Sequence, residues 1–405
     1  MKYKFMLLKE TVLEVLRDPI RPAHPRPMVE RAVYATFPKK KSREAVILKG
    51  VRRSGKSTLL LQQLETLGRG VFCNFEDTRL FGFAPDDFAR FIECVQTIGP
   101  APSAVFLDEV QEVEAWERLV RALLDKGHAV WVSGSNASLL TREVGAKLTG
   151  RHRSFEVFPF DYQEYIRFRR LKVGVASLDR FLGEGGFPGF LADGDPSLLQ
   201  ELLRDIVQRD IALRHGIRET RHLMNLVLFL LAHRGQPFSM QKLSKILQIP
   251  SVSQTSAYLE YLEDAYLLQS LPKQSHSFKK RIVAPRKYYA VDNGLAAINN
   301  PQSTPDRGRR LENQVFLALR QRGIEAAYDG ETDLWECDFV YDDTALQVCW
   351  ELTPSNQERE IAGLLEAIRR SKGRLRQAII LTRNQSDEFL VDGQSIRLVP
   401  AWKWL

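Results

Sequence analysis

The sequence predicts an α/β protein with a parallel sheet that carries helices on both faces, followed by helical and mixed segments. Between residues 45 and 160, short apolar runs alternate with helical stretches, which is the element order of a parallel sheet. A glycine-rich loop separates the first apolar run from the first helix of this region. Residues 236–300 then change to helix, turn, helix and two strands.

Composition limits the classes of function. The chain has 405 residues, a formal net charge of +8 and four cysteines without metal-ligand spacing. The length predicts several globular domains. The cysteines predict a reducing compartment and neither a zinc site nor a disulfide framework. No apolar run approaches the ~20 residues that span a bilayer. We expect a cytoplasmic protein without a membrane partner.

The core strands are expected within residues 45–160, after an N-terminal segment, residues 1–44, that contains a short helix and a proline-rich stretch. Proline lacks an amide proton and fixes φ, so this stretch cannot continue the helix. Four runs have the β-rich composition of buried strands: AVILKG, GVFCNFED, SAVFLDEV and HAVWVSGSN. Residues 155–160 are expected to form an extended segment that closes the domain.

Three further domains are expected after the core. Residues 161–235 carry apolar side chains at helical spacing, with a GEGGFPG loop between the helices. Residues 236–300 combine a helix, a Pro-Ser turn, a second helix and two strands around a basic tip, which is the pattern of a winged helix. Residues 301–405 alternate helices and strands and predict a small α/β domain.

The glycine-rich loop Gly50–Ser57 matches the P-loop pattern G-x-x-x-x-G-K-[ST], between a strand and a helix. Its two glycines let backbone N–H groups point at phosphate oxygens. Lys56 is expected to reach the β- and γ-phosphates of ATP, and the Ser57 hydroxyl to bind Mg²⁺. We assign eight residues to nucleotide contacts: Gly50, Arg52, Arg53, Ser54, Gly55, Lys56, Ser57 and Thr58.

The run Ala104–Glu109 places two carboxylates directly after four apolar residues, as in a Walker B motif. Asp108 is expected to bind Mg²⁺ through water. Glu109 is expected to act as the general base that polarises the attacking water.

Other groups could orient that water or neutralise charge in phosphoryl transfer. The fourth strand ends at Ser135 and Asn136, where a polar side chain would lie between the two motif strands; Asn136 is the first choice as sensor and Ser135 the alternate. An arginine that neutralises transition-state charge contributes ~10³–10⁵ in rate. From the sequence alone its candidates stay open: Arg142, Arg151, Arg153 and Arg214.

The segments GVRRSGKST, LDEVQ, SGSNASLLTREVGAKLTGR and FEVFPFDYQEY resemble a group of prokaryotic AAA-superfamily ATPases. Later segments, among them LLRDIVQRDIALRHGI, LEDAYLL and YYAVDNGL, resemble a domain family of unknown function that accompanies them. The resemblance implies an AAA-type core and a helical lid before the winged helix. It also makes Arg151 the preferred arginine finger and Arg214 the lid sensor.

The same resemblance implies that residues 301–405 are similar to PD-(D/E)-x-K restriction endonucleases. The matching positions are Glu312, Asp338 and Gln347, and Glu351 could join them in a metal site. However, Cys349 stands where such a nuclease has its lysine, so the attacking water and the phosphate lose their positive partner. A fold retained for binding or assembly is therefore favoured over cleavage.

The functional hypothesis is an oligomeric, DNA-binding ATPase with ATP and Mg²⁺ as ligands, which remodels or translocates duplex or branched DNA without reading its sequence. A trans-acting arginine would require a homo-oligomer, such as a hexameric ring. Positive charge favours polyanionic partners. The DNA contacts are expected at the hairpin: Lys279, Lys280, Arg281, Arg286 and Lys287. The alternatives are a nucleotide-gated regulatory switch and an ATP-dependent nuclease.

Overall fold

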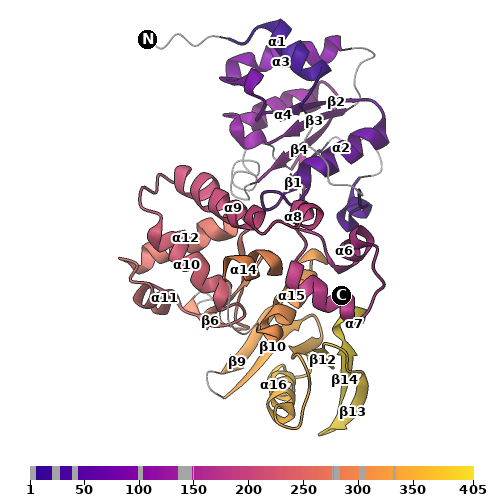
Figure 1. Cartoon of the computed structure of the whole chain (residues 1–405), viewed down its shortest axis with the longest axis vertical. Helices are drawn as coiled ribbons and strands as arrows, with labels where there is room; N and C mark the ends of the chain where they lie inside the picture. Colours follow the sequence, from indigo (N-terminus) through magenta and orange to yellow (C-terminus); the bar gives the residue numbers. More distant parts are fainter. Residues whose placement is uncertain are drawn as a thin grey trace. The chain divides into compact units, whose positions relative to one another are not determined.

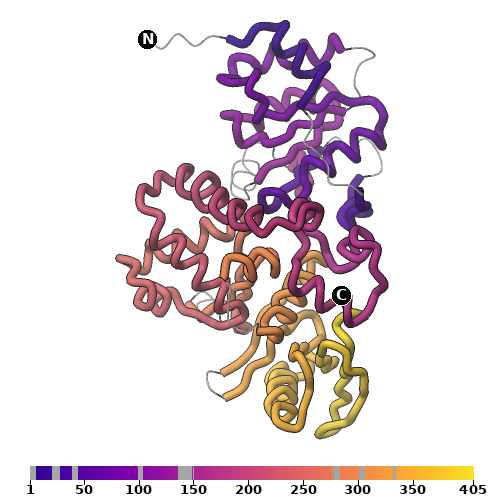
Figure 2. Tube along the Cα trace, viewed as in Figure 1, coloured from indigo at the N-terminus to yellow at the C-terminus, as the bar shows by residue number. Residues whose placement is uncertain are grey.

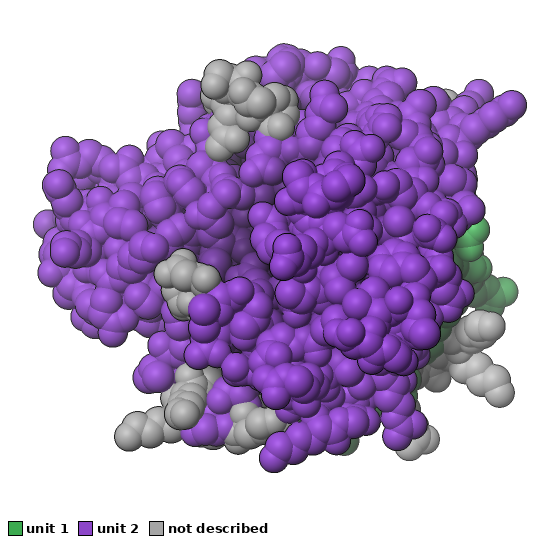
Figure 3. Space-filling model, turned by 90° about the horizontal axis from the view of Figure 1, so that it is seen from below, with its two compact units in different colours: residues 1–158, 264–266 green, residues 159–263, 267–405 purple. Residues whose placement is uncertain are grey.

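The computed structural model describes residues 6–20, 28–38, 44–98, 104–135, 148, 150–275, 277, 283–300, 306–331 and 334–405. The chain divides into two compact units, coloured separately in Figure 3: Met1–Phe158 with Asp264–Tyr266, and Pro159–Glu263 with Leu267–Leu405. Figure 2 follows the backbone through each unit. None of the helices described is both long and apolar enough to cross a membrane.

The first unit contains the predicted parallel sheet (Figure 1), so the expected α/β fold class is confirmed. Its five strands lie in the order β2-β3-β4-β1-β5, and every neighbouring pair is parallel. The strands are β1 (Ala45–Lys49), β2 (Gly70–Asn74), β3 (Ala104–Asp108), β4 (Ala129–Gly134) and β5 (His152–Glu156). Strand β4 therefore separates the strand before the glycine-rich loop from the strand that ends in the two carboxylates.

Helices cover both faces of this sheet because successive strand side chains point to opposite faces. Ile47 of β1 packs with α1, α3 and α4 on one face, whereas Val46 and Leu48 pack with α2 on the other. Both clusters consist of buried apolar side chains, so both faces of the sheet are covered, as is usual for parallel sheets. The helices are α1 (Lys9–Arg17), α2 (Lys56–Leu67), α3 (Phe88–Thr97) and α4 (Trp116–Asp125), with short 3₁₀ turns at Ala32–Thr36, Thr78–Leu80, Pro85–Asp87 and Val110–Glu112.

The last strand of the sheet begins and ends earlier than the sequence predicts. An extended segment was expected over 155–160, but β5 covers His152–Glu156. The amide of Val157 still donates to Lys49 O at 2.7 Å. Pro159 follows two residues later and has no amide proton, so it cannot extend the ladder.

The second unit begins with helices, as predicted. Part of the helical region expected over 161–235 is divided into two segments, α9 (Ser197–Asp205) and a π-helix, η6 (Ile206–Leu213). Two short helices, α7 (Val175–Glu184) and α8 (Pro188–Asp193), lie on either side of the GEGG loop. The other helices of this part are α6 (Tyr162–Arg169) and α10 (Arg221–Ala232).

The buried carboxylate of Asp292 ties the GEGG loop to the segment YYAVDNGL. Asp292 accepts hydrogen bonds from the amides of Gly186 at 2.6 Å and Leu295 at 2.8 Å, and so caps α14 (Asn293–Asn299). Burial raises the pKa of Asp292 to about 6 despite these bonds. A Cβ at Gly185 would lie 2.2 Å from Asp292 Oδ1, and φ there is +74°. Only glycine meets both demands at this position.

Residues 237–290 form the helix and strand order that the predicted winged helix requires. β6 (Pro237–Phe238), α11 (Met240–Ile246), α12 (Val252–Asp264), β7 (Leu268–Leu271) and β8 (Arg286–Ala290) follow one another along the chain. The three strands make an antiparallel sheet in the order β6-β8-β7, with β8 in the centre. The identification as a winged helix stays a prediction.

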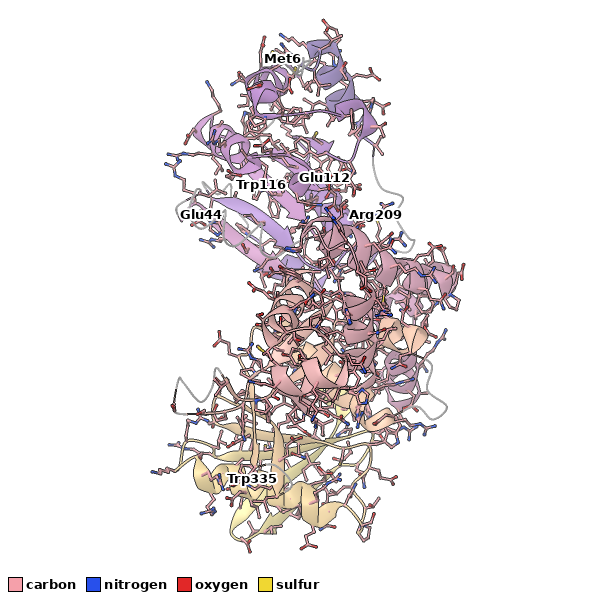
Figure 4. All side chains as sticks on the ribbon, turned by 90° about the vertical axis from the view of Figure 1, so that its left-hand side faces the viewer. Met6, Glu44, Glu112, Trp116, Arg209 and Trp335 are labelled. Atoms are coloured by element: carbon pink, nitrogen blue, oxygen red, sulfur yellow. The ribbon has the colours of Figure 1, made fainter. Side chains whose placement is uncertain are left out.

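The C-terminal segment of the second unit contains a separate mixed sheet, in the order β13-β14-β12-β11-β10-β9. Its elements are α15 (Arg307–Gln321), β9 (Ala327–Glu331), β10 (Trp335–Tyr341), β11 (Thr344–Val348), α16 (Gln357–Arg370), β12 (Gln377–Thr382), β13 (Asp387–Val391), β14 (Gln394–Pro400) and α17 (Ala401–Trp404). Trp335, labelled in Figure 4, marks the start of β10. The similarity to restriction endonucleases stays a prediction.

Candidate functional site

The glycine-rich loop connects β1 to α2 at the carboxyl end of the sheet, where open α/β sheets bind ligands. Gly50 has φ +154°, and a Cβ there would lie 2.1 Å from Val157 O. Gly55 precedes α2 with φ +101°. Both positions therefore require glycine, for close approach at Gly50 and for the left-handed backbone at Gly55.

The side chain of Lys56 folds into this loop. It is 3% exposed, and its ammonium donates to Gly50 O at 3.0 Å and Val51 O at 2.9 Å. Because Lys56 is the first residue of α2, its charge lies beside the positive end of the helix dipole. A buried ammonium next to a helix N-terminus is an arrangement that binds phosphate.

Asp108 lies close to this loop, although 52 positions separate it from Lys56 in the sequence. Leu107 pairs with Val132, which brings Asp108 beside Ser133, and the Ser133 hydroxyl donates to Asp108 Oδ1. Burial, and then the neighbouring charge of Glu109, raises the pKa of Asp108 to about 6; hydrogen bonds from Ser133 and Ser57 and the charge of Lys56 oppose the rise. The structure thus brings Lys56, Ser57 and Asp108 together.

Glu109 has a backbone conformation that is unusual for a residue with a side chain. Its φ and ψ are 52° and 46°, in the left-handed region, which costs about 1–2 kcal/mol for an L-residue. Its amide lies 3.4 Å from Ser133 Oγ, and its carboxylate accepts a hydrogen bond from the Gln111 amide. This turn places Glu109 at the sheet edge, directly after the strand that carries Asp108.

Strand β4 ends between the two motif strands, as the sequence predicts, and Ser135 directly follows its last residue. Ser135 is 1% exposed, and its hydroxyl has no hydrogen-bond partner among the residues described. A buried polar group without a partner is uncommon in folded proteins. Asn136, the first choice as sensor, lies outside the described residues.

The four arginine candidates differ in their surroundings. Arg153 is exposed and pairs with Glu44. Arg142 lies outside the described residues. Arg151 is exposed on the first unit and pairs with Asp125 at 2.7 Å. Arg214 belongs to the second unit, at the end of the π-helix, and its Nη1 is buried without a hydrogen-bond partner in the described part of the chain.

Arg31 supports the glycine-rich loop and was not predicted from the sequence. The side chain is 7% exposed, and its two terminal nitrogens donate to Ser54 O at 3.0 Å and Phe158 O at 2.5 Å. The guanidinium thus links the loop to the segment after β5. Arg31 lies next to the proline-rich stretch without a motif of its own, so no sequence pattern could have identified it.

Replacing Arg31 with methionine is expected to lower the free energy of unfolding by about 1–3 kcal/mol, because two buried carbonyls lose a charged donor. ATP affinity should fall with it, since Ser54 belongs to the loop. Urea unfolding and calorimetric titration with ATP measure the two effects. Arg121→Met, on the exposed face of α4, is the matched control. Equal stability and affinity in both variants would contradict the role given to Arg31.

The four residues predicted as a degenerate nuclease-like site line one pocket of the second unit. This pocket has a volume of about 1240 Å³ and also includes Cys349 in its wall. Its members are Glu312, Asp338, Gln347 and Glu351. Gln347 is held at both ends of its amide: Oε1 accepts from the Asp338 amide at 3.2 Å, and Nε2 donates to Glu360 at 2.7 Å.

The position of Lys287 contradicts its prediction as a DNA contact. It was expected to be exposed on the hairpin, but its side chain is 0% exposed and pairs with Glu312, Glu336 and Asp338. The reason is that β8 is the central strand of its sheet and packs on α15, which the sequence pattern does not reveal. Arg286 is half-buried and donates to Ser270 Oγ at 3.3 Å. Lys279, Lys280 and Arg281 lie outside the described residues.

Comparisons with known proteins agree with the geometry of the first unit. Residues 42–166 match a family model described as an AAA domain, and residues 175–304 match a domain of unknown function, DUF8612. Two solved structures are also similar in part. The Aeropyrum pernix Orc1 protein in complex with DNA shares 12% identity, with 73% of this chain and 92% of that chain covered and a TM-score of 0.26. The S. cerevisiae Hsp104:casein complex shares 11%, with coverages of 67% and 61% and a TM-score of 0.31. TM-scores this low establish neither a common fold nor a shared function.

Two relatives match along most of the chain. The uncharacterized protein of Haemophilus influenzae is 29% identical over 381 residues, which cover 88% of this chain and 93% of that protein. The uncharacterized protein MJ1544 of Methanocaldococcus jannaschii is 31% identical over 392 residues, which cover 88% and 87%. The chain therefore belongs to the family of the Methanocaldococcus jannaschii protein, and its residues 42–166 match the AAA domain model.

Proposed function

We propose that the first unit binds ATP and hydrolyses it. The observation that carries this proposal is the gathering of Lys56, Ser57 and Asp108 at the carboxyl end of a parallel sheet, with Glu109 next in the chain. Lys56 would neutralise the β- and γ-phosphates, and the amides of the loop would bind their oxygens. Glu109 would take the proton of the attacking water, so the γ-phosphoryl group passes to that water and ADP leaves.

The residues present suit a magnesium ion. Mg²⁺ prefers oxygen ligands and usually keeps several waters, with one or two protein groups and the phosphates completing its shell. The Ser57 hydroxyl and the Asp108 carboxylate are hydrogen-bonded to each other and would supply those protein oxygens. When bound, the ion would neutralise charge on the phosphates. Asp108 is 1% exposed, and the ion would also offset the free-energy cost of burying it as a carboxylate.

Release of phosphate from ATP tests this proposal. We expect Mg²⁺-dependent release by the wild-type chain and none above background with EDTA. Asp108→Asn keeps the size of the side chain and removes its charge, so it should lower the rate strongly. An Asp108→Asn chain that hydrolyses ATP at the wild-type rate would remove Asp108 from the site.

Lowering the pH from 7 to 5 is expected to weaken Mg²⁺-dependent ATP binding by about tenfold, because the pKa of Asp108 is about 6 and the ion needs the carboxylate. The effect on stability has the opposite sign. A carboxyl whose pKa rises on folding, here from 3.8 to about 6, binds its proton more tightly in the folded chain, so the free energy of unfolding falls as the pH rises from about 4 to about 6 and then levels off. Calorimetry at pH 5, 6 and 7 measures the binding, after correction for the protonation of ATP in buffer. An affinity that does not change with pH would contradict the assignment.

We also propose that Arg151 completes the site of a neighbouring copy in a homo-oligomer. Its side chain is 53% exposed and, within the part of the chain that the structure describes, pairs with the similarly exposed Asp125, so little energy opposes its leaving that pair. Mixing Arg151→Ala chains with Lys56→Ala chains tests a trans role, since mixed assemblies would regain some intact sites. Activity that stays absent in the mixture, together with a monomeric wild type in ATP, would refute it.

We further propose that the second unit binds duplex or branched DNA and that ATP turnover moves it along or remodels that DNA. The net charge of +8 and the helix, turn, helix and hairpin order of residues 240–290 support this. With Lys287 buried, the basic hairpin residues that remain candidates are Lys279, Lys280, Arg281 and Arg286.

Fluorescence anisotropy with duplex, forked and four-way-junction DNA at low salt tests the DNA proposal. The triple variant Lys279→Ala/Lys280→Ala/Arg281→Ala should bind more weakly and show a shallower dependence on salt, because fewer counterions are released. Lys126→Ala, on an exposed helix end of the first unit, is the control. No binding by the wild type to any of the three forms would end this proposal.

A further inference from the structure

Three carboxylates that line the large pocket of the second unit surround the buried ammonium of Lys287. Lys287 Nζ lies 3.1 Å from Glu312 Oε1, 2.8 Å from Glu336 Oε1 and 3.0 Å from Asp338 Oδ1. The acidic groups come from α15 and β10, whereas Lys287 comes from β8. Glu336 and Asp338 share one face of β10 because side chains alternate along a strand.

Glu312 and Asp338 accept hydrogen bonds from the ammonium, and Glu336 forms an ion pair with it. A lysine ammonium has three protons, and three carboxylate oxygens lie within hydrogen-bond distance of it. Other donors bind the same acids: Tyr289 OH donates to Glu312 at 2.7 Å, and the amide of Val348 donates to Asp338 Oδ2 at 2.9 Å. Lys287 is therefore the centre of a closed network rather than a free charge.

The backbone fixes Lys287 in this position. Residue 287 pairs with Pro237 of β6 on one side and with Leu271 of β7 on the other. Next to it, Tyr289 stacks on Phe316 of α15 with ring centroids 4.3 Å apart. The amide and carbonyl of Ala290 exchange hydrogen bonds with the Asn313 side chain at 2.8 and 3.0 Å. These contacts hold the backbone of β8, and so the Cα of Lys287, beside α15.

We propose that Lys287 is a built-in counterion that occupies the place of a metal ion and closes this carboxylate cluster to divalent cations. Converging carboxylates are the ligands that Mg²⁺, Mn²⁺ and Ca²⁺ prefer. Mg²⁺ needs its oxygens at about 2.0–2.1 Å, whereas these oxygens surround a nitrogen at 2.8–3.1 Å. The cluster is spaced for an ammonium, and an ion could enter only by expelling Lys287.

The electrostatics of the cluster agree with this geometry. Burial disfavours the charge on Lys287, but the acidic groups around it outweigh burial and hold the pKa of its ammonium well above the ordinary value. Burial raises the pKa of Glu312 to about 7, against the opposing effect of Lys287.

Two consequences follow for the pocket. The cluster does not support metal-dependent cleavage of DNA, because the position of the ion is filled by a side chain that the sheet holds. The same ion pairs join β8 to α15 and β10, so residues 286–290 and the C-terminal mixed sheet share one interior in the second unit.

Counting bound Mn²⁺ by electron paramagnetic resonance tests the proposal. The full-length chain is used without nucleotide and with Asp108→Asn, so that the site of the first unit does not contribute. We expect no bound Mn²⁺ when Lys287 is present and one ion per chain after Lys287→Met. Asp338→Asn added to Lys287→Met should remove that ion. Lys242→Met, which removes an exposed lysine from the wall of the same pocket, should not create a site.

Lys287→Met also leaves three acids without their counterion, so this variant could fail to fold. The charge-matched variant Lys287→Met/Glu312→Gln then replaces it, keeps Glu336 and Asp338, and should bind Mn²⁺ more weakly. Two results would overturn the proposal. One is Mn²⁺ binding by the chain with Lys287 that Asp338→Asn abolishes, and the other is a folded Lys287 variant that binds no Mn²⁺.

Discussion

Lys56→Ala is expected to reduce ATP affinity by roughly 100-fold or more. Its ammonium is a buried charged group inside the glycine-rich loop, and hydrogen bonds to charged groups contribute about 1.5–3 kcal/mol each. Two such bonds to the phosphates account for a loss of this size. The fold should persist, because Gly50 and Gly55, not the lysine, set the course of the loop. Calorimetric titration with Mg·ATP measures the affinity.

Lys126→Ala is the matched control, since it removes an ammonium from an exposed position at the end of α4. It should bind ATP as the wild type does. Circular dichroism and urea unfolding establish that both variants are folded. If Lys56→Ala retained wild-type affinity in a folded chain, the phosphates would have to bind elsewhere.

Glu109→Gln is expected to lower turnover by roughly 10²–10⁴-fold while ATP affinity changes only slightly. The amide keeps the size of the carboxylate and its hydrogen bond with Gln111, but it cannot accept the proton of the attacking water. Binding depends on Lys56 and Ser57, which the substitution leaves in place. Phosphate release and nucleotide affinity are measured on the same preparation.

Glu112→Gln tests whether the loss is specific. Glu112, labelled in Figure 4, lies three residues further on, is exposed, and carries the same charge. It should hydrolyse ATP at the wild-type rate. A Glu109→Gln chain with normal turnover would show that Glu109 is not the base and would direct attention to other groups at the sheet edge.

The sequence predicts the first unit well because its signals are local. Each strand of the parallel sheet is a short apolar run, and each motif residue directly follows a strand, so periodicity and spacing locate them. The sequence predicts that β4 lies between β1 and β3, and this position brings Ser133 beside Asp108. The end of β5 is less certain from sequence, because the strand boundary depends on which neighbour pairs with it.

Contacts between distant segments could not be predicted. Arg31 contacts Phe158 across 127 residues, and Lys287 contacts Asp338 across 51. In the sequence both are basic residues in loop or hairpin surroundings, where charge usually means exposure. Burying Lys287 needs acids from two other elements, and only Asp338 and Glu312 had been singled out, for a different role. The sequence could have indicated Glu336, because it lies two positions before Asp338 in the same strand and so on the same face.

The two units lead to different expectations for chemistry. In the first, a lysine, a hydroxyl and two carboxylates gather where a charged ligand could enter, and Asp108 is buried at a cost that a divalent ion would offset. In the second, the carboxylates already have a cation from the chain itself. We therefore expect catalysis at Gly50–Ser57 and no metal-dependent step at the pocket beside Lys287.

A single-turnover experiment shows whether the first unit hydrolyses the ATP that it binds. The wild-type chain is mixed in excess over radiolabelled ATP with Mg²⁺, quenched over time, and the nucleotide is separated, so slow product release cannot hide the chemical step. We predict conversion of bound ATP to ADP and phosphate by the wild type and recovery of intact ATP from Glu109→Gln. Intact ATP recovered from a wild-type chain that binds it would contradict the account.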